Sequence, residues 1–157
     1  MDLKEIVKIL TDKGLTISAM ESCTGGGFTN ALTNIEGASE VIKFSAVTYA
    51  NEFKVKMGVD EKILNKYTVY SFEVADEMSS NISKFADSDI GVGITGKLNR
   101  VDKCNPYGED NVVYVSVFDK KNDKHYHELV KATLASRKEN KELVIQSVSR
   151  ILSEILK

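Results

Sequence analysis

The sequence has 157 residues, 42% of them hydrophobic and 28% charged, with a net charge of −2, and this length favours one domain, residues 1–157, with its own core. The acidic balance excludes a broad basic surface, so no nucleic-acid partner is expected. The N-terminus lacks the pattern of a signal peptide, and no apolar stretch approaches the ~20 residues of a membrane span, so no membrane partner is expected. Cys23 and Cys104 lie far apart in the sequence, which suggests a reducing compartment, and we therefore expect a cytoplasmic protein.

The first half of the chain predicts short, alternating helices and strands. Asp2 and Glu5 form a capping-box pair before the first helix, and Gly14 stands where that helix is expected to end. Asn51 is a good N-cap for a later helix. The expected elements are a strand over 15–20, a helix over 28–33, a loop over 35–39, a strand over 44–50, a helix over 52–58 and a short helix over 60–66.

The second half predicts a long helix, a hairpin and a last helix. Ser71 caps the long helix, whose expected inner face consists of Val74, Met78, Ile82 and Phe85. Strands are expected over 88–95, 111–119 and 124–133, and a second capping box, Ser136 with Glu139, starts the last helix. This alternation predicts an α/β fold: a three-layer α/β/α sandwich with a mixed, mostly parallel sheet of about five strands.

The most informative segment is Met20–Gly27, which reads M-E-S-C-T-G-G-G and directly follows an apolar strand. Three consecutive glycines let the backbone take positive φ angles and let a ligand approach the N–H groups of Gly25–Gly27. The start of the following helix adds unpaired N–H donors, which suit the oxyanion of acyl transfer or a phosphate. The segment therefore predicts a nucleophile, Ser22 or Cys23, beside an anion-stabilising turn.

Ser22 is favoured over Cys23 as the nucleophile, because a cysteine nucleophile generally needs a histidine partner and both histidines lie on the predicted fifth strand. A serine without histidine needs another base, and a lysine can serve if its pKa falls toward neutrality. If Asn51 is the N-cap, Lys54 is the third helical residue, where the helix dipole opposes its charge. Tyr49, at the end of the second strand, is placed to pass a proton between serine and lysine or to donate to a leaving group.

Three other patterns each have a purely structural interpretation as well as a functional one. Gly91–Gly96 matches G-x-G-x-x-G but lies inside a strand, which excludes a dinucleotide fingerprint and favours close backbone packing. His125 and His127 face one side of a strand, yet two histidines alone make a weak metal site, so an exposed strand face is favoured. The polar stretch 97–110 either lines a site or is a surface excursion.

Three chemically suggestive groups are expected on one rim of the sheet. Ser22, Tyr49 and Thr95–Gly96 each lie at the carboxyl end of a predicted strand. In open α/β sheets, ligands bind outside these ends. The convergence predicts a single site at this edge.

Three segments resemble one known family: 21–26 (E-S-C-T-G-G), 31–39 (A-L-T-N-I-E-G-A-S) and 47–54 (V-T-Y-A-N-E-F-K), with similar segments at 74–78 and 94–96. They resemble the CinA C-terminal domain, the nicotinamide-nucleotide amidohydrolases or NMN deamidases, over almost the whole chain. The resemblance implies hydrolysis of the carboxamide of nicotinamide mononucleotide to nicotinic acid mononucleotide and ammonia. It implies Ser22 as nucleophile, Tyr49 and Lys54 as its activating partners, no metal and no cofactor.

A small-molecule nucleotide would be held by residues around the same rim. Those expected to bind it are Glu21, Thr24, Gly25, Gly26, Asn51, Thr95 and Gly96. Its phosphate carries about two negative charges, and a bidentate arginine suits a phosphate better than a point charge. Arg137, at the capped start of the last helix, is therefore the expected phosphate anchor, with Arg100 second and Lys103 also available.

The chain departs from the family pattern after Thr95–Gly96. The family continues with a glycine-rich stretch, whereas residues 97–111 here are polar and only Asn105–Gly108 is faintly comparable. A catalytically weak or inactive nucleotide-binding domain is therefore the alternative to an amidohydrolase. Because family members often self-associate, the resemblance also implies a homo-oligomer.

Overall fold

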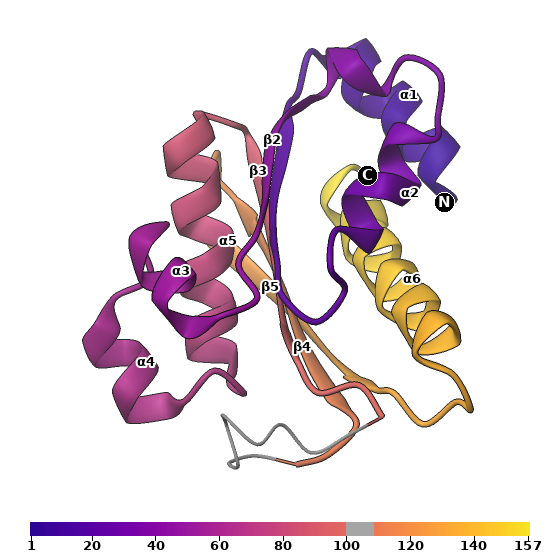
Figure 1. The fold of residues 1–157 in the computed structure, drawn as a ribbon. Coiled ribbons are helices and arrows are strands. Elements are labelled where there is room, and N and C mark those ends of the chain that lie inside the picture. Colours follow the sequence, from indigo (N-terminus) through magenta and orange to yellow (C-terminus); the bar gives the residue numbers. More distant parts are fainter. Residues whose placement is uncertain (100–108) are drawn as a thin grey trace.

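A five-stranded sheet forms the middle of the molecule (Figure 1). The structure is a computed structural model and describes residues 1–99 and 109–157. The strands are β1 (Ile17–Glu21), β2 (Ile42–Val47), β3 (Ile90–Gly96), β4 (Val112–Asp119) and β5 (Lys124–Lys131), in the order β2-β1-β3-β4-β5. β1 pairs in parallel with β2 and β3, and β4 pairs antiparallel with β3 and β5. This confirms the predicted mixed sheet.

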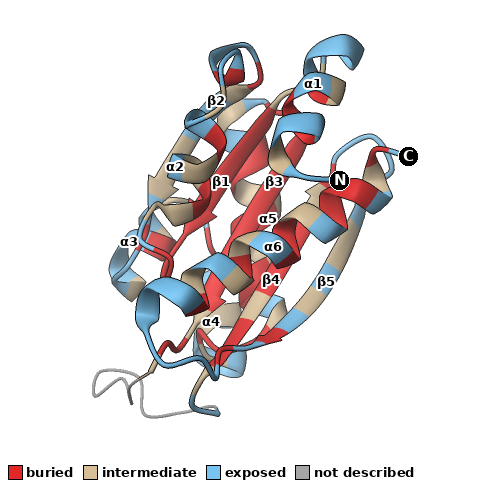
Figure 2. Cartoon of the chain, turned by 90° about the vertical axis from the view of Figure 1, so that its right-hand side faces the viewer, coloured by how far each residue is buried: buried red, intermediate tan, exposed pale blue. Residues whose placement is uncertain are grey.

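Helices cover both faces of the sheet, which confirms the three-layer sandwich (Figure 1). One layer contains α1 (Leu3–Lys13), α2 (Gly27–Thr33) and α6 (Arg137–Ile155). The other contains α3 (Asn51–Lys56), α4 (Glu61–Tyr67) and α5 (Phe72–Ala86). Of the strands between them, β1, β3 and β4 are mostly buried, whereas the edge strands β2 and β5 are mostly half-buried or exposed (Figure 2). No helix in the described part of the chain is long and apolar enough to cross a membrane.

The helix ends follow the predicted capping chemistry. Asp2 accepts a hydrogen bond from the N–H of Glu5, and the Glu5 carboxylate accepts one from the N–H of Asp2. Ser136 and Glu139 make the same reciprocal pair at α6. Gly14 ends α1 with a φ of 63°, in the left-handed region that favours glycine. Local sequence therefore fixes where α1 and α6 begin.

The segment after β2 differs from the prediction. β2 ends at Val47 instead of residue 50, and Ala50, with extended backbone, is the N-cap of α3. Asn51 is then the first helical residue and Lys54 the fourth, so the predicted third position for Lys54 is wrong. The predicted loop over 35–39 also contains part of a short 3₁₀ helix, Ala38–Glu40.

Glycines in β3 let α5 lie directly against the sheet. A Cβ atom on Gly91 would collide with the carbonyl oxygen of Ser79, and one on Gly93 with that of Ala75. The interpretation of this glycine pattern as close backbone packing is thus confirmed.

The predicted inner position of Phe85 is wrong. Its side chain is 64% exposed, because the buried stripe of α5 ends at Ile82 and Ser83. The Phe85 ring instead contacts Phe44 of β2, with 5.1 Å between the ring centroids.

Candidate functional site

Ser22 stands at the carboxyl end of β1, where the strand gives way to the glycine turn. Its N–H donates to the carbonyl of Ile94 on β3 over 3.0 Å, so the backbone at Ser22 is still held by the sheet. The residue is 7% exposed, and its Oγ accepts a hydrogen bond from Lys54 Nζ at 3.0 Å. The predicted partnership of these two side chains is therefore present in the structure.

Lys54 reaches Ser22 from α3, on the neighbouring edge of the sheet. Its side chain is 1% exposed, and Nζ also donates to the carbonyl oxygens of Thr48 at 2.7 Å and Tyr49 at 3.4 Å. The N–H of Thr48 donates in turn to the Glu21 carbonyl over 2.8 Å, which ties this segment to β1. Nζ thus directs N–H groups at three oxygens, and once it loses the proton directed at Ser22, its lone pair faces the Ser22 hydroxyl, as a general base requires.

Tyr49 lies on the rim of the site and does not bridge Ser22 and Lys54. Its carbonyl faces Lys54, whereas its side chain is 61% exposed. Its hydroxyl accepts a hydrogen bond from Arg137 at 3.3 Å, and Arg137 also donates to the carbonyl of Leu98. The predicted phenol bridge is thus replaced by a contact between the segment that follows β2 and the start of α6.

The Glu21 carboxylate serves the start of α2. It accepts hydrogen bonds from the Thr24 hydroxyl at 2.6 Å, from the N–H groups of Phe28 and Thr29, and from the Thr29 hydroxyl. Glu21 and Thr24 are both buried. The structure therefore gives these two predicted substrate-binding residues a supporting role that holds the turn in shape.

The glycine turn uses two of its three predicted donors internally. Gly25 donates to the Ser22 carbonyl at 2.9 Å, and Gly27 donates to the Thr24 carbonyl at 3.0 Å. Gly25 and Gly26 have φ angles of 60° and 91°, which explains the need for glycine. Within the described part of the chain, the N–H of Gly26 has no acceptor, so it is the glycine donor left for a ligand.

Cys23 is buried beside this turn and is held as a thiol. Burial raises its pKa to about 12, although the positive charges of Lys54 and Arg137 act in the opposite direction. A thiolate is the reactive form of cysteine, so this environment disfavours Cys23 as the nucleophile.

We expect Cys23 to resist alkylation in the folded protein. In a Cys104→Ser variant, iodoacetamide at pH 8 should label Cys23 far more slowly than free cysteine, because the raised pKa leaves very little thiolate. Labelling should reach the normal rate in denaturant, as measured by mass spectrometry. Rapid labelling of the folded protein would contradict the buried, protonated thiol.

Some of the other residues predicted to bind the ligand make contacts within the protein instead. The Thr95 hydroxyl donates to the Val69 carbonyl at 2.7 Å, and Gly96 packs against the backbone of Val112 on β4. Asn51 begins α3, next to the segment that holds Lys54. Arg100 lies outside the described residues, as do Lys103 and most of the polar stretch, so their predicted roles stay predictions.

Lys141 joins the site although sequence reasoning did not single it out. Its Nζ lies 3.6 Å from the position that a Cβ atom on Gly25 would occupy. Lys141 follows Arg137 by four residues on α6, and this helical spacing is the signal that links the two.

A second polar cluster lies on the face of the sheet that α5 covers. Asp76 Oδ1 contacts His127 Nε2 at 2.5 Å, His125 Nδ1 at 3.3 Å and the Ser116 hydroxyl at 2.6 Å. Ser79 and Ser116 are fully buried, so neither is open to a substrate. The histidines face one side as predicted, but they are held by Asp76 and are not a plain exposed face. Among the described residues, no group of three or more His, Cys, Asp or Glu side chains is arranged to hold a metal ion.

The His125 environment makes stability depend on pH. Burial lowers the His125 pKa from 6.5, against the raising effect of the Asp76, Asp123 and Glu77 charges and with the help of His127. As the pH falls below 6.5, the unfolded chain takes up this proton first, so the free energy of unfolding should fall with it. Above the His125 pKa values of both the folded and the unfolded protein, His125 is neutral in both states, so the free energy of unfolding does not change with pH on its account.

Chemical denaturation at a series of pH values from 8 down to about 5, above the range of ordinary carboxylates, measures this effect. The fall in the free energy of unfolding with decreasing pH should be less steep in a His125→Asn variant. An equal slope in the variant, or a gain in stability on acidification, would contradict the assignment.

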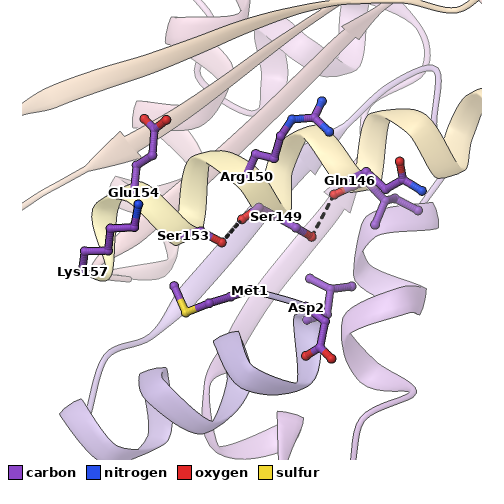
Figure 3. Close-up of a pocket in the computed structure, with 10 residues that line it drawn as sticks. Met1, Asp2, Gln146, Ser149, Arg150, Ser153, Glu154 and Lys157 are labelled. Carbon is purple, nitrogen blue, oxygen red and sulfur yellow. Dashed lines mark hydrogen bonds between the residues drawn. The ribbon is translucent and has the colours of Figure 1, made fainter.

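A hollow of about 650 Å³ opens between the start of α1 and the outer side of α6 (Figure 3). Three of its polar side chains are paired within the protein: Ser149 donates to the Ile145 carbonyl, Ser153 donates to that of Ser149, and Arg150 pairs with Glu128. None of the predicted site residues lines it. The candidate site is therefore the one around Ser22.

Comparisons with known proteins show the family to which this chain belongs. The sequence profile of the CinA C-terminal domain matches residues 2–156. A competence-damage inducible protein of Alkaliphilus oremlandii is 49% identical over 98 residues, which cover 61% of this chain and 24% of that protein. A CinA-like protein of Kosmotoga olearia is 46% identical over 92 residues, which cover 58% of this chain and 22% of that protein. The chain thus spans about a quarter of the length of these curated relatives.

The fold has a solved counterpart. The crystal structure of the competence/damage inducible protein CihA from Agrobacterium tumefaciens matches this chain with a TM-score of 0.85 and 26% identity, covering 100% of this chain and 97% of that one. The fold and the site define an α/β sandwich domain with a serine–lysine pair at the carboxyl edge of its parallel strands. The chain belongs to the CinA C-terminal domain family, as the resemblance of its motifs predicts.

Proposed function

We propose that this domain hydrolyses the carboxamide of nicotinamide mononucleotide, giving nicotinic acid mononucleotide and ammonia. The observation that carries the proposal is the 3.0 Å hydrogen bond between Lys54 Nζ and Ser22 Oγ, made in a nearly water-free setting. A buried lysine directed at a serine hydroxyl is the pairing that serine catalysis without histidine requires. Family membership supports the proposal, because the motifs that place both residues are those of the CinA C-terminal domain.

In the proposed mechanism, Ser22 Oγ attacks the carboxamide carbon while neutral Lys54 takes the hydroxyl proton. The negative charge that develops on the carboxamide oxygen is stabilised by N–H groups of the turn, with Gly26 as the available glycine donor. The intermediate collapses, the C–N bond breaks, and the amide nitrogen leaves as ammonia with the proton returned by Lys54. Water then attacks the ester, Lys54 takes one of its protons, and the proton passes to Ser22 as the acid is released.

Tyr49 and Arg137 complete the proposed site. The Tyr49 carbonyl helps to hold Lys54, and the Tyr49 hydroxyl, which accepts a hydrogen bond from Arg137, is proposed to relay the Lys54 proton to the leaving nitrogen. Arg137 keeps its predicted role as phosphate anchor because its guanidinium lies on the same rim, and Arg100 stays the second candidate. Asn51, Thr95 and Gly96 stay proposed walls of the nucleotide pocket.

Ammonia release from nicotinamide mononucleotide tests the proposal directly. The purified protein should produce ammonia and nicotinic acid mononucleotide in equal amounts, measured by a coupled ammonia assay and by chromatography. Tight binding of the mononucleotide without product would instead favour a nucleotide-binding domain that has lost turnover, the alternative that the divergent polar stretch suggests.

We also propose that the protein works in the cytoplasm as a homo-oligomer. Val47, Tyr49 and Phe53 expose large apolar surfaces beside the outer edge of β2, which supports self-association near the site. Light scattering coupled to size-exclusion chromatography measures the oligomeric state, and a monomer at micromolar concentration would contradict the proposal.

A further inference from the structure

One face of α6 runs along the glycine turn and carries two cations. Lys141 Nζ lies 3.6 Å from the Cβ position of Gly25, and Ile145 Cδ1 lies 3.7 Å from that of Gly27. Arg137, one helical turn before Lys141, reaches Tyr49 across the site. The spacing of four residues places all three α6 side chains on one face, so Arg137 and Lys141 both border the turn that starts at Ser22.

Neither cation has an acidic partner among the residues that the structure describes. Arg137 donates to the hydroxyl of Tyr49 and the carbonyl of Leu98, which leave its charge uncompensated, and Lys141 makes no ion pair or hydrogen bond there. Lys97, a buried lysine at the same edge of the sheet, differs: it has Asp110 at 3.6 Å and lies over the ring of Tyr70. Like charges four residues apart on a helix repel each other, so Arg137 and Lys141 destabilise α6 unless a bound anion compensates their charges.

The surroundings increase the positive character of this corner. Lys54 lies at the same turn, with Nζ 3.0 Å from Ser22 Oγ, so the protonated form that the proposed reaction passes through adds to the positive charge there. The carboxylate of Glu21, which lies beside the turn, is enclosed by its four hydrogen-bond donors at the start of α2. The corner is therefore suited to an anion although the protein carries a net charge of −2.

We propose that Lys141 and Arg137 together bind the phosphate monoester of the ligand, with Lys141 as the residue that distinguishes a nucleotide from its phosphate-free riboside. The Ser22–Gly25 hydrogen-bonded turn keeps those two Cα atoms within about 7 Å of each other, so a ligand whose carboxamide lies at Ser22 can bring a phosphate to Lys141. The identity of the base in this ligand rests on the proposed function, whereas the anion site does not require turnover.

Isothermal titration with three probes tests this pair: nicotinic acid mononucleotide, its riboside, and ribose 5-phosphate. Lys141→Met should weaken both phosphate-bearing probes by about 10- to 100-fold, the loss expected for a charge-assisted hydrogen bond, and should leave riboside binding nearly unchanged. Lys138→Met is the matched control, because it removes the same charge from an exposed position of the same helix.

The outcomes separate this proposal from the proposed function. If ribose 5-phosphate binding depends on Lys141 while no mononucleotide is hydrolysed, the anion pair stands and the amidohydrolase assignment fails. Equal losses in Lys138→Met and Lys141→Met, equal losses for riboside and mononucleotide, or no binding of ribose 5-phosphate to the wild type would overturn the anion pair. A fall in kcat without any change in phosphate-probe binding would assign Lys141 to the oxyanion and overturn it as well.

Discussion

The Ser22→Ala variant is expected to release ammonia from nicotinamide mononucleotide at least about 10³-fold more slowly than the wild type. The reason is that alanine removes the atom that would form the acyl intermediate, and Lys54 then loses the hydroxyl it contacts at 3.0 Å. Binding of nicotinic acid mononucleotide, measured by titration calorimetry, should change little, because Ser22 contributes a reacting atom and not the main ligand contacts.

Cys23→Ala is the matched control for this change, since it alters the next residue of the same turn. It should keep ammonia release close to the wild-type rate, because the Cys23 thiol is buried with a pKa raised to about 12. Loss of activity in Cys23→Ala together with near-normal activity in Ser22→Ala would reverse the assignment of the nucleophile.

The Lys54→Met variant should also lose ammonia release by about 10²-fold or more, the range typical of a lost general base. Methionine keeps an apolar stem of similar length but removes every N–H donor and the lone pair. It also leaves the Thr48 carbonyl, which accepts from Nζ at 2.7 Å, without this donor, so we expect stability to fall by roughly 1–3 kcal/mol. Thermal unfolding followed by circular dichroism measures that second effect.

Lys56→Met separates the role of Lys54 from a general loss of charge on α3. Lys56 is exposed, and its nearest carboxylate is Glu52 at 3.6 Å, an exposed pair that contributes little. Its replacement should leave both turnover and thermal unfolding nearly unchanged. An active Lys54→Met protein with normal kcat would contradict the role of Lys54 as base.

Much of the fold follows from local chemistry that a sequence displays. Asp2 with Glu5 and Ser136 with Glu139 satisfy helix N–H groups within a few residues, so the starts of two helices were predictable. The pairing of Ser22 with Lys54 was also predictable, because both follow parallel strands whose carboxyl ends meet at one edge.

Other features depend on contacts between distant segments, which periodicity does not reveal. The hydroxyl of Tyr49 lies against Arg137, 88 residues away, instead of between Ser22 and Lys54. Lys141 comes to the glycine turn because α6 packs along it. Asp76 meets His125 and His127 because α5 packs on β4, and β4 pairs with β5, the strand that carries both histidines. In each case, the packing of a helix on the sheet sets the partner.

The identity of the residue that carries the acyl group tests the central claim most directly. Wild-type protein is mixed with nicotinamide mononucleotide, quenched with acid at short times and digested, and the peptide that contains both Ser22 and Cys23 is sequenced by tandem mass spectrometry. The proposed mechanism predicts the acyl group of nicotinic acid mononucleotide on the Ser22 oxygen, and none on this peptide from Ser22→Ala. An acyl group on Cys23 or on a residue outside this turn would contradict it.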